Sequence, residues 1–481
     1  MPDAIHPPAL HPDAIQAHAP ASKSISHRLL IASALACGSS TLEGVLASDD
    51  TLRTRQILSL AGAGFEPLPS RQGCESFRVR GTSGRLAGGT DEPLSCNAHE
   101  SGTTCRLLTA VLATGSGRFR IHGAERLHRR PIGELARVLA LLGVPLEFEA
   151  ATGYPPVRID ACGLHAGRLP LDREDDGGWR RLGVSMEESS QYFSGLLLAA
   201  PLADAPLVLT LAGAKAVSWP YIGLTLKCLA DFGIRFEVEE RGAPDGTAPW
   251  RRADWRQIAE ALPGRIRVKV RPSPYRAGRF RCEGDWSGAS YFVAAGALGR
   301  KPVCIEGADA SSIQGDRAIL DILERMGGRW EAADRAVAVP PARLHGARLD
   351  MGRCPDLVPT VCAMAAFADG ETIIENVAHL RIKESDRIKA PCEALRAIGC
   401  QACEREDGMR IQGLGSSARI RLQGLALKAS NDHRMAMSQA LFSLRARDMG
   451  TSEVRSIIDN PACVNKSFPE FWHAWEAFAD D

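Results

Sequence analysis

Residues 22–45 read SKSISHRLLIASALACGSSTLEGV, and this stretch decides the fold because its pattern returns five more times along the chain. It opens with small or polar residues, continues as an apolar run of helix length, and passes through Gly into a strand-like segment rich in β-branched residues. The other copies begin at Ser101, Ser189, Ser287, Pro355 and Ser430, at intervals of 68 to 98 residues. Self-similarity of this kind indicates related supersecondary units. The sequence therefore predicts six α/β units, and not six unrelated helices.

A second helix is expected in five of the six units. Each of these segments reaches a Gly before a further strand, as in PIGELARVLALLGVPLEFE at residues 131–149. Gly directly after an apolar helix is typical of a left-handed C-terminal cap. The sixth unit ends instead in FPEFWHAWEAFAD, residues 468–480, and its predicted strand is TSEVRSI, residues 451–457.

Six units in one chain predict an α/β fold of two pseudo-symmetric domains, with three helix–strand units in each. One domain is expected to span residues 22–284, and the other to be discontinuous and to combine residues 1–21 with residues 285–481. Two polar stretches, residues 173–183 and 239–281, are expected to be inserted loops because turn-forming and charged residues cluster in them.

Composition and charge exclude several classes of protein. Lys and Arg number 58 against 57 Asp and Glu, and a net charge of +1 provides no general field for a nucleic acid. The longest nearly apolar run, residues 196–214, contains Pro201, Asp204 and Pro206, so it predicts a helix, a turn and a strand instead of a membrane span. The first 20 residues carry no recognisable targeting pattern, and the 14 Cys are scattered, mostly within apolar segments. A cytoplasmic protein is expected.

Basic residues stand in or beside the polar turns that open the helices. Such turns suit phosphate or carboxylate because a helix N-terminus carries about half a positive charge and several free N–H groups. Pro131, directly after Arg130, is expected to begin a helix, and the spacing in RIKESDR predicts that Lys383 and Arg387 share one helical face. The full set is Lys23, Arg28, Arg130, Lys383, Arg387, Arg434 and Lys466. Capping or surface solvation explains each residue alone, but the set predicts a site for phosphates and carboxylates.

The chain resembles the 5-enolpyruvylshikimate-3-phosphate synthase family in ten ordered motifs: ASKSISHR, SGTTCRLL, RRPIGEL, SSQYFSGLLLAAPL, VSWPYI, GDWSGASYF, CPDLVPT, RIKESDR, SNDHRMAM and NKSFPEF. The resemblance implies a two-domain inside-out α/β barrel of six units with the active site in the cleft between the domains. It implies transfer of the enolpyruvyl group of phosphoenolpyruvate to the 5-hydroxyl of shikimate 3-phosphate, without a metal or organic cofactor. The expected partners are these small molecules alone. A monomer is expected, because no heptad pattern marks an interface.

The same resemblance implies roles for individual residues. Asp356 is expected to be the base toward the 5-hydroxyl, and Glu384 and Lys23 are expected to be the proton-transfer pair. The implied contacts of shikimate 3-phosphate, mostly in the 22–284 domain, are Lys23, Ser24, Arg28, Ser189, Ser190, Gln191, Ser218, Tyr221, Asp356 and Lys383. The implied contacts of phosphoenolpyruvate are Lys23, Gly102, Arg130, Gln191 and a carboxylate clamp of Arg387, Arg434 and Lys466 in the discontinuous domain.

Alternatives remain open at this point. Glu100, His27 and His379 stand where the family usually has Asn, which keeps open a divergent paralogue that uses a related cyclic alcohol. The UDP-N-acetylglucosamine enolpyruvyl transferases usually carry a Cys that residues 107–130 lack. A non-catalytic binding protein with the same fold predicts loss of proton-transfer or clamp residues, and all of these are present.

Overall fold

The computed structural model describes residues 13–479 apart from residues 176, 243–247, 259 and 334. Expectations about residues 1–12, and about those parts of the two expected loops, lie outside the described residues. The chain divides into two compact units, residues 23–282 and residues 1–22 with 283–481, here called the continuous and the discontinuous unit. The division falls one residue after the first predicted boundary and two residues before the second.

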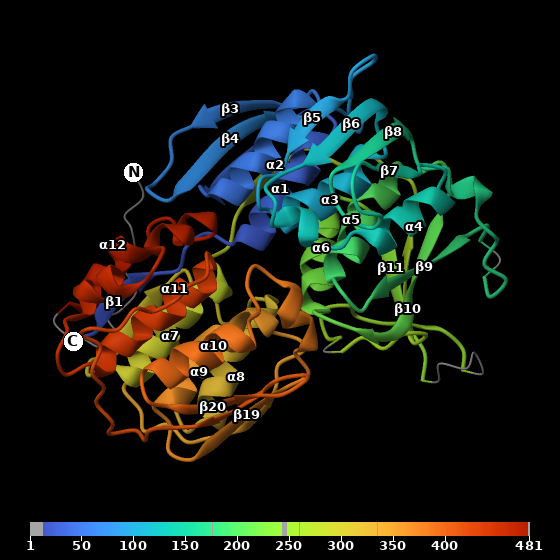
Figure 1. Ribbon diagram of the computed structural model, residues 1–481. Helices are drawn as coiled ribbons and strands as arrows, with labels where there is room; N and C mark the ends of the chain where they lie inside the picture. The colour runs from blue at the N-terminus through green and yellow to red at the C-terminus, as the bar shows by residue number, and fades with distance from the viewer. Residues whose placement is uncertain (1–12, 176, 243–247, 259, 334, 480–481) are drawn as a thin grey trace. The chain divides into compact units, whose positions relative to one another are not determined.

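The continuous unit contains three helices that are buried along almost their whole length, α1, α3 and α5. After the first turn they are mostly apolar, and sheets and further helices cover them (Figure 1). The helices are α1 (Lys23–Leu35), α2 (Asp49–Leu60), α3 (Gly102–Leu112), α4 (Gly133–Leu141), α5 (Ser190–Ala199) and α6 (Pro220–Asp231), with short 3-10 turns η1 (Leu127–Arg129), η2 (Ala166–Arg168) and η3 (Ala200–Leu202).

Three sheets belong to this unit, in the orders β14-β2-β4-β3, β5-β6-β8-β7 and β12-β11-β13-β10-β9. Each sheet has one parallel pair at one edge, formed by β14 with β2, β5 with β6 and β9 with β10. The other pairs are antiparallel. The strands are β2 (Ser39–Leu46), β3 (Gly64–Leu68), β4 (Cys74–Arg80), β5 (Leu94–Asn97), β6 (Ser116–His122), β7 (Leu146–Phe148), β8 (Val157–Cys162), β9 (Arg180–Met186), β10 (Leu207–Ala216), β11 (Phe236–Glu240), β12 (Arg251–Arg252), β13 (Ile266–Val270) and β14 (Arg279–Arg281).

The discontinuous unit repeats this plan with α7, α9 and α11 as its fully buried helices. Its helices are α7 (Trp286–Leu298), α8 (Ile319–Arg325), α9 (Val358–Ala366), α10 (Lys389–Ala397), α11 (His433–Ala440) and α12 (Phe471–Trp475). Its 3-10 helices are η4 (Gly315–Ala318), η5 (Pro355–Leu357), η6 (Ala378–Ile382), η7 (Leu441–Arg445), η8 (Thr451–Ile457), η9 (Pro461–Lys466) and η10 (Glu476–Phe478).

Its two sheets have the orders β1-β15-β17-β16 and β18-β19-β21-β20. In the first, the N-terminal strand pairs in parallel with β15, Ile15 opposite Val303, which ties the start of the chain to this unit. The strands are β1 (Ile15–His18), β15 (Val303–Glu306), β16 (Glu331–Ala333), β17 (Ala336–Val339), β18 (Arg348–Asp350), β19 (Glu371–Glu375), β20 (Gln401–Glu404) and β21 (Met409–Gln412). No helix in the described part of the chain is long and apolar enough to cross a membrane.

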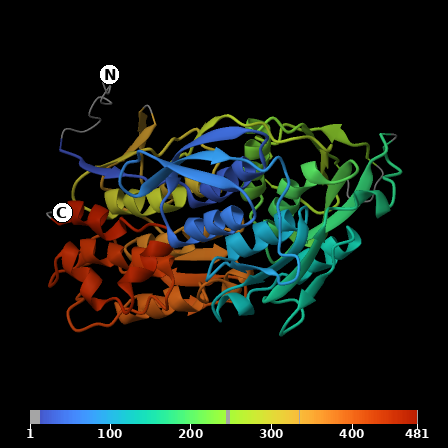
Figure 2. The ribbon, with the colours of Figure 1, turned by 90° about the horizontal axis from the view of Figure 1, so that it is seen from above.

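The predicted strand TSEVRSI is wrong, because residues 451–457 form the 3-10 helix η8. The buried residues of this segment are Thr451 and Val454, three apart, which is helical spacing and not the alternation of a strand. Extended pairing in the sixth unit is limited to isolated parallel bridges such as that of Leu427 with Ile458. The red C-terminal segment is accordingly helical turns and loops in Figures 1 and 2.

The prediction that residues 239–281 form an inserted loop is also wrong for part of the stretch. It contains β12, β13 and β14, and β13 is an inner strand of its sheet with all five residues buried. Arg267 and Lys269 of β13 are buried because acidic partners surround them; Arg267, for example, pairs with Asp172 at 2.8 Å. The other expected loop, residues 173–183, ends within β9, which begins at Arg180.

The sixth unit is held by aromatic packing where the other units have a sheet. Trp475 is fully buried, with its ring 5.5 Å from that of Phe471 and 4.8 Å from that of Phe478. We expect Trp475→Ala to lower the free energy of unfolding by about 3–5 kcal/mol, since a large core ring is replaced by a cavity. Urea denaturation followed by circular dichroism measures this effect. Leu414→Ala, at an exposed position of the preceding repeat, is the control, and an equal loss in both variants would contradict the assignment.

Candidate active site

Arg387 is the centre of the charged cluster in the discontinuous unit. Its side chain is almost completely buried and is held by three carboxylates. Asp432 accepts from Nε at 2.8 Å and from Nη2 at 3.0 Å, which fixes the plane of the guanidinium. The remaining contacts are from Nη1 to Asp356 at 2.9 Å and from Nη2 to Glu384 at 3.0 Å. The structure thus brings the predicted base, the predicted proton-transfer carboxylate and one clamp residue together.

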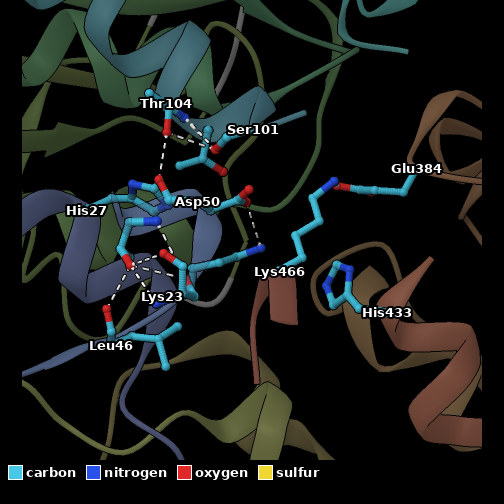
Figure 3. Close-up of polar contacts among 12 residues, drawn as sticks. Lys23, His27, Leu46, Asp50, Ser101, Thr104, Glu384, His433 and Lys466 are labelled. Atoms are coloured by element: carbon cyan, nitrogen blue, oxygen red, sulfur yellow. Dashed lines mark hydrogen bonds and ion pairs between the residues drawn. The ribbon is translucent and has the colours of Figure 1, made fainter. Parts of the chain in front are cut away.

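The other clamp residues join the same cluster. Arg434 donates from Nη2 to Asp356 Oδ2 at 2.7 Å, and Lys466 Nζ lies 3.6 Å from Glu384 Oε1 (Figure 3). Burial by itself would raise the pKa of Asp356, but Arg434, Arg387 and the half-buried Lys383 hold it well below its usual range. Asp356 therefore carries its negative charge among these cations.

The predicted helical face of RIKESDR is wrong. Residues 383–388 lie between η6 and α10, and Lys383 has an extended backbone at the end of η6. The helix begins only at Lys389, because Asp386 Oδ1 accepts hydrogen bonds from the N–H groups of Ile388 and Lys389. The Glu384–Arg387 ion pair is therefore formed across a turn and not along a helix. Similarly, α4 begins at Gly133, two residues later than the predicted start at Pro131.

In the continuous unit, Lys23 starts α1 and lies 3.3 Å from Asp50 of α2 (Figure 3). Arg28, one turn further, is buried in α1 and donates to the carbonyl oxygens of Ser24 and Tyr221 at 2.8 and 2.9 Å. Burial lowers the pKa of Arg28 to about 10. These two carbonyl acceptors are neutral, so they orient Arg28 without cancelling its positive charge.

A chain of hydroxyl groups links α1 to the start of α3. His27 Nδ1 is 2.8 Å from Thr54 Oγ1, which is 2.8 Å from Thr104 Oγ1, and Thr104 in turn donates to Ser101 Oγ at 2.8 Å (Figure 3). Ser101 is also the N-cap of α3, where its side chain accepts from the N–H of Thr104. Burial, aided by Lys23 and Arg28, lowers the pKa of His27 to about 3, so the ring is neutral. The chain thus fixes the α3 N-terminus without adding charge.

Gly102 and Arg130 meet at that N-terminus. A Cβ atom added at Gly102 would lie 2.4 Å from Arg130 Cζ, so the guanidinium occupies the space that any side chain would need. Gln191 of α5 is close to the same helix, because its Nε2 donates to Thr103 Oγ1 at 2.9 Å and its Oε1 accepts from Arg106 at 3.0 Å. The structure therefore places Gly102, Arg130 and Gln191 near the start of α3. With Lys23, these are the continuous-unit residues predicted to contact phosphoenolpyruvate.

The remaining predicted contacts lie at the starts of α5 and α6. Ser189 is the N-cap of α5 and accepts from the N–H of Gln191, and Ser190 is its first helical residue. Ser218 is buried with a positive φ of 57° just before α6, and Tyr221 contributes its carbonyl oxygen to Arg28. These contacts stabilise the helix starts and orient Arg28, and the ligand roles of the four residues stay predictions.

Sequence reasoning missed Asp432, Asp50 and Arg106, which orient predicted site residues. Asp432 stands at the N-cap of α11, and Asp50 in the first turn of α2, so each looks like a capping or dipole residue in sequence. Arg106 is buried and binds Gln191 and the Pro131 carbonyl oxygen. For Arg106, the sequence signal was a charged residue inside the mostly apolar run of α3.

Gly102→Ala is expected to displace the Arg130 guanidinium while leaving the fold intact. The side chain that must move ends in a flexible group, so the melting temperature should stay within about 2 °C of wild type. A crystal structure of the variant measures the displacement. Gly133→Ala is the matched control, since its Cβ would meet nothing closer than 3.5 Å. An unmoved Arg130 in the Gly102 variant would refute this description of the α3 N-terminus.

Comparisons with known proteins identify the family. The family model of EPSP synthase (3-phosphoshikimate 1-carboxyvinyltransferase) matches residues 14–247 and 258–475. The 3-phosphoshikimate 1-carboxyvinyltransferase of Ralstonia nicotianae is 36% identical over 96% of both chains, and that of Methanosphaerula palustris is 37% identical over 95% of both. The structure of EPSP synthase from Acinetobacter baumannii has a TM-score of 0.70 at 23% identity and covers 96% of this chain and 95% of its own.

The enolpyruvyl transferase NikO from Streptomyces tendae has a TM-score of 0.67 at 17% identity, with 97% of this chain and 95% of its own covered. At these identities the two structures show the fold, and they confirm the predicted fold class. The sequence matches confirm the predicted enzyme family. This chain belongs to the EPSP synthase family.

Proposed function

We propose that this enzyme transfers the enolpyruvyl group of phosphoenolpyruvate to the 5-hydroxyl of shikimate 3-phosphate and releases phosphate. The observation that carries the proposal is the pairing of two carboxylates, Asp356 and Glu384, with one buried guanidinium, Arg387. The two carboxylates supply two proton-transfer groups that Arg387 holds at a fixed separation, and they lie beside cations suited to an anionic substrate.

The reaction needs three proton movements. The 5-hydroxyl oxygen bonds to C2 of phosphoenolpyruvate while Asp356 takes the hydroxyl proton, and a proton from the Glu384–Lys23 pair reaches the methylene carbon. The new methyl group then returns a proton to the Glu384–Lys23 pair, and the electrons of that C–H bond restore the double bond. The C2–O bond to phosphate breaks at the same time, and phosphate leaves with the electron pair of the C2–O bond, so no oxidant or reductant is required.

The carboxylate of phosphoenolpyruvate is proposed to bind Arg387, Arg434 and Lys466. In the substrate-free cluster these cations are already paired with Asp356 and Glu384. A substrate carboxylate that takes a share of Arg434 and Arg387 weakens their hold on Asp356, and the pKa of Asp356 then rises. Substrate binding therefore converts a weak base into a competent one.

The phosphate groups are proposed to bind in the continuous unit. The α3 N-terminus offers backbone N–H groups, Gly102 allows close approach, and Arg130 lies against it. Shikimate 3-phosphate is proposed to bind Lys23, Ser24, Arg28, Ser189, Ser190, Gln191, Ser218 and Tyr221, with Lys383 and Asp356 of the discontinuous unit.

Both units must then serve one pair of substrates. Compaction on substrate binding, measured by small-angle X-ray scattering, tests this requirement. We further propose a cytoplasmic monomer.

The function is tested by phosphate release from phosphoenolpyruvate with shikimate 3-phosphate or, separately, UDP-N-acetylglucosamine as acceptor. Release with shikimate 3-phosphate alone is expected. If folded protein releases phosphate with neither acceptor, the proposed acceptor becomes a related cyclic alcohol. Failure to bind phosphoenolpyruvate as well as to release phosphate would leave a binding protein of another specificity.

Asp356→Asn should lower kcat by about 10²–10⁴-fold, because an amide cannot take the hydroxyl proton. The affinity for shikimate 3-phosphate, measured by calorimetry, should stay within about tenfold, since an amide still forms a hydrogen bond. Asp321→Asn, on the exposed face of α8, is the control and should match wild type. Turnover of the Asp356 variant near the wild-type rate would remove Asp356 from the mechanism.

A further inference from the structure

Asp316 is a buried acidic residue outside the predicted site. It lies in η4, and its Oδ2 accepts a hydrogen bond from Ser287 Oγ at the start of α7. The neighbouring Gln314 fixes η4 to that helix start, since its side chain accepts from the Trp286 N–H at 3.3 Å and donates to the Gly284 carbonyl oxygen at 2.7 Å. The position of the Asp316 carboxyl group is therefore set by backbone contacts of the neighbouring residue.

A short bonded path leads from Asp316 to the proposed base. The Ser287 hydroxyl that donates to Asp316 also accepts from Arg434 Nη2 at 3.3 Å. The same Nη2 donates to Asp356 Oδ2 at 2.7 Å. One hydroxyl and one guanidinium thus connect two carboxyl groups, and all four residues belong to the discontinuous unit.

The charges around Asp316 are those of the proposed site. The pKa of Asp316 is raised to about 7, chiefly by burial; Asp356 and Asp285 also act to raise it, while Arg434 and Ser287 act to lower it. Cys354 also faces Asp316, and burial raises the pKa of its thiol, so it remains neutral. A negative charge on either carboxyl group disfavours ionisation of the other because like charges repel, while Arg434 favours the ionised form of Asp316 and of Asp356.

We propose that Asp316 is a positioning residue that holds Arg434 through Ser287. By its negative charge, Asp316 weakens the interaction of Arg434 with Asp356. The inference rests on the proposed function, in which Asp356 is the base and Arg434 binds the carboxylate of phosphoenolpyruvate. With Asp316 ionised, Arg434 is shared between two carboxylates and releases Asp356 more readily. Without that charge, Arg434 holds any carboxylate, from substrate or protein, more strongly.

Asp316→Asn separates this role from a structural one. The amide keeps the size and the hydrogen bond to Ser287 but removes the charge. We expect KM for phosphoenolpyruvate to fall about threefold to tenfold while kcat falls about tenfold, the change given by one unit in the pKa of Asp356. Ser287→Ala, which breaks the path but keeps both charges, should lower kcat less and leave KM within about threefold. Asp321→Asn is the exposed control on the neighbouring helix.

A merely structural Asp316 gives the opposite pattern, because a loosened cluster raises KM as kcat falls. That outcome, or kinetic constants within twofold of wild type, would overturn the proposal. A wild-type enzyme that does not turn over shikimate 3-phosphate overturns the proposed function instead. In that case the stability measurement described next still tests whether the pKa of Asp316 is raised in the folded protein.

Thermal unfolding measured from pH 5 to pH 8 needs no substrate. A carboxyl group whose pKa is higher in the folded than in the unfolded state keeps its proton only when folded, so ionisation as pH rises through about 7 weakens folding. The melting temperature of Asp316→Asn minus that of wild type should therefore increase from pH 5 to pH 8. A difference that does not change with pH would show that the pKa of Asp316 is not raised in the folded protein, and it would contradict the buried, negatively charged surroundings described for Asp316.

Discussion

The burial of Arg387 is the constraint on which the discontinuous unit's site depends. A guanidinium cannot be neutralised by losing its proton, so a buried one requires carboxylates within bonding distance. Asp432 meets this requirement with two hydrogen bonds, and the same carboxylate caps α11. The start of α11, the turn before α10 and the η5 turn that carries Asp356 are thereby fixed around one cation. The two proposed proton-transfer groups acquire their separation from this arrangement.

The two units solve the burial of arginine in different ways. Arg387 is matched by acidic groups, whereas Arg28 donates to carbonyl and hydroxyl oxygens, including Thr225 Oγ1 at 2.8 Å and Ser194 Oγ at 3.2 Å. Neutral acceptors orient a guanidinium without cancelling its field. These acceptors therefore leave the positive charge of Arg28 in place, while the carboxylates around Arg387 offset its charge.

The repeat made most of the fold predictable, because five of the six copies form a sheet and the buried helices begin where small polar residues precede apolar runs. The failures have physical causes. Arg267 and Lys269 made β13 look like a solvated loop, and only distant acidic residues such as Asp172 allow their burial. RIKESDR has helical spacing, but Asp386 caps a helix that starts later. Motifs located the residues predicted to bind substrate, whereas the contacts of Asp432 with Arg387 and of Asp316 with Ser287 join residues far apart in sequence.

Several side chains both cap a helix and contact a predicted site residue or its neighbours. In the sequence alone they look like ordinary helix caps. Ser101 caps α3 and ends the hydroxyl chain from His27, and Asp432 caps α11 and orients Arg387. Where one carboxylate or hydroxyl holds both a helix start and a site residue, a change in the site cannot leave the helix unaffected. The helix starts are therefore rigid parts of the site. Adaptation to substrate must occur in groups that hold no helix start, among them Lys466, Glu384 and the guanidinium end of Arg434.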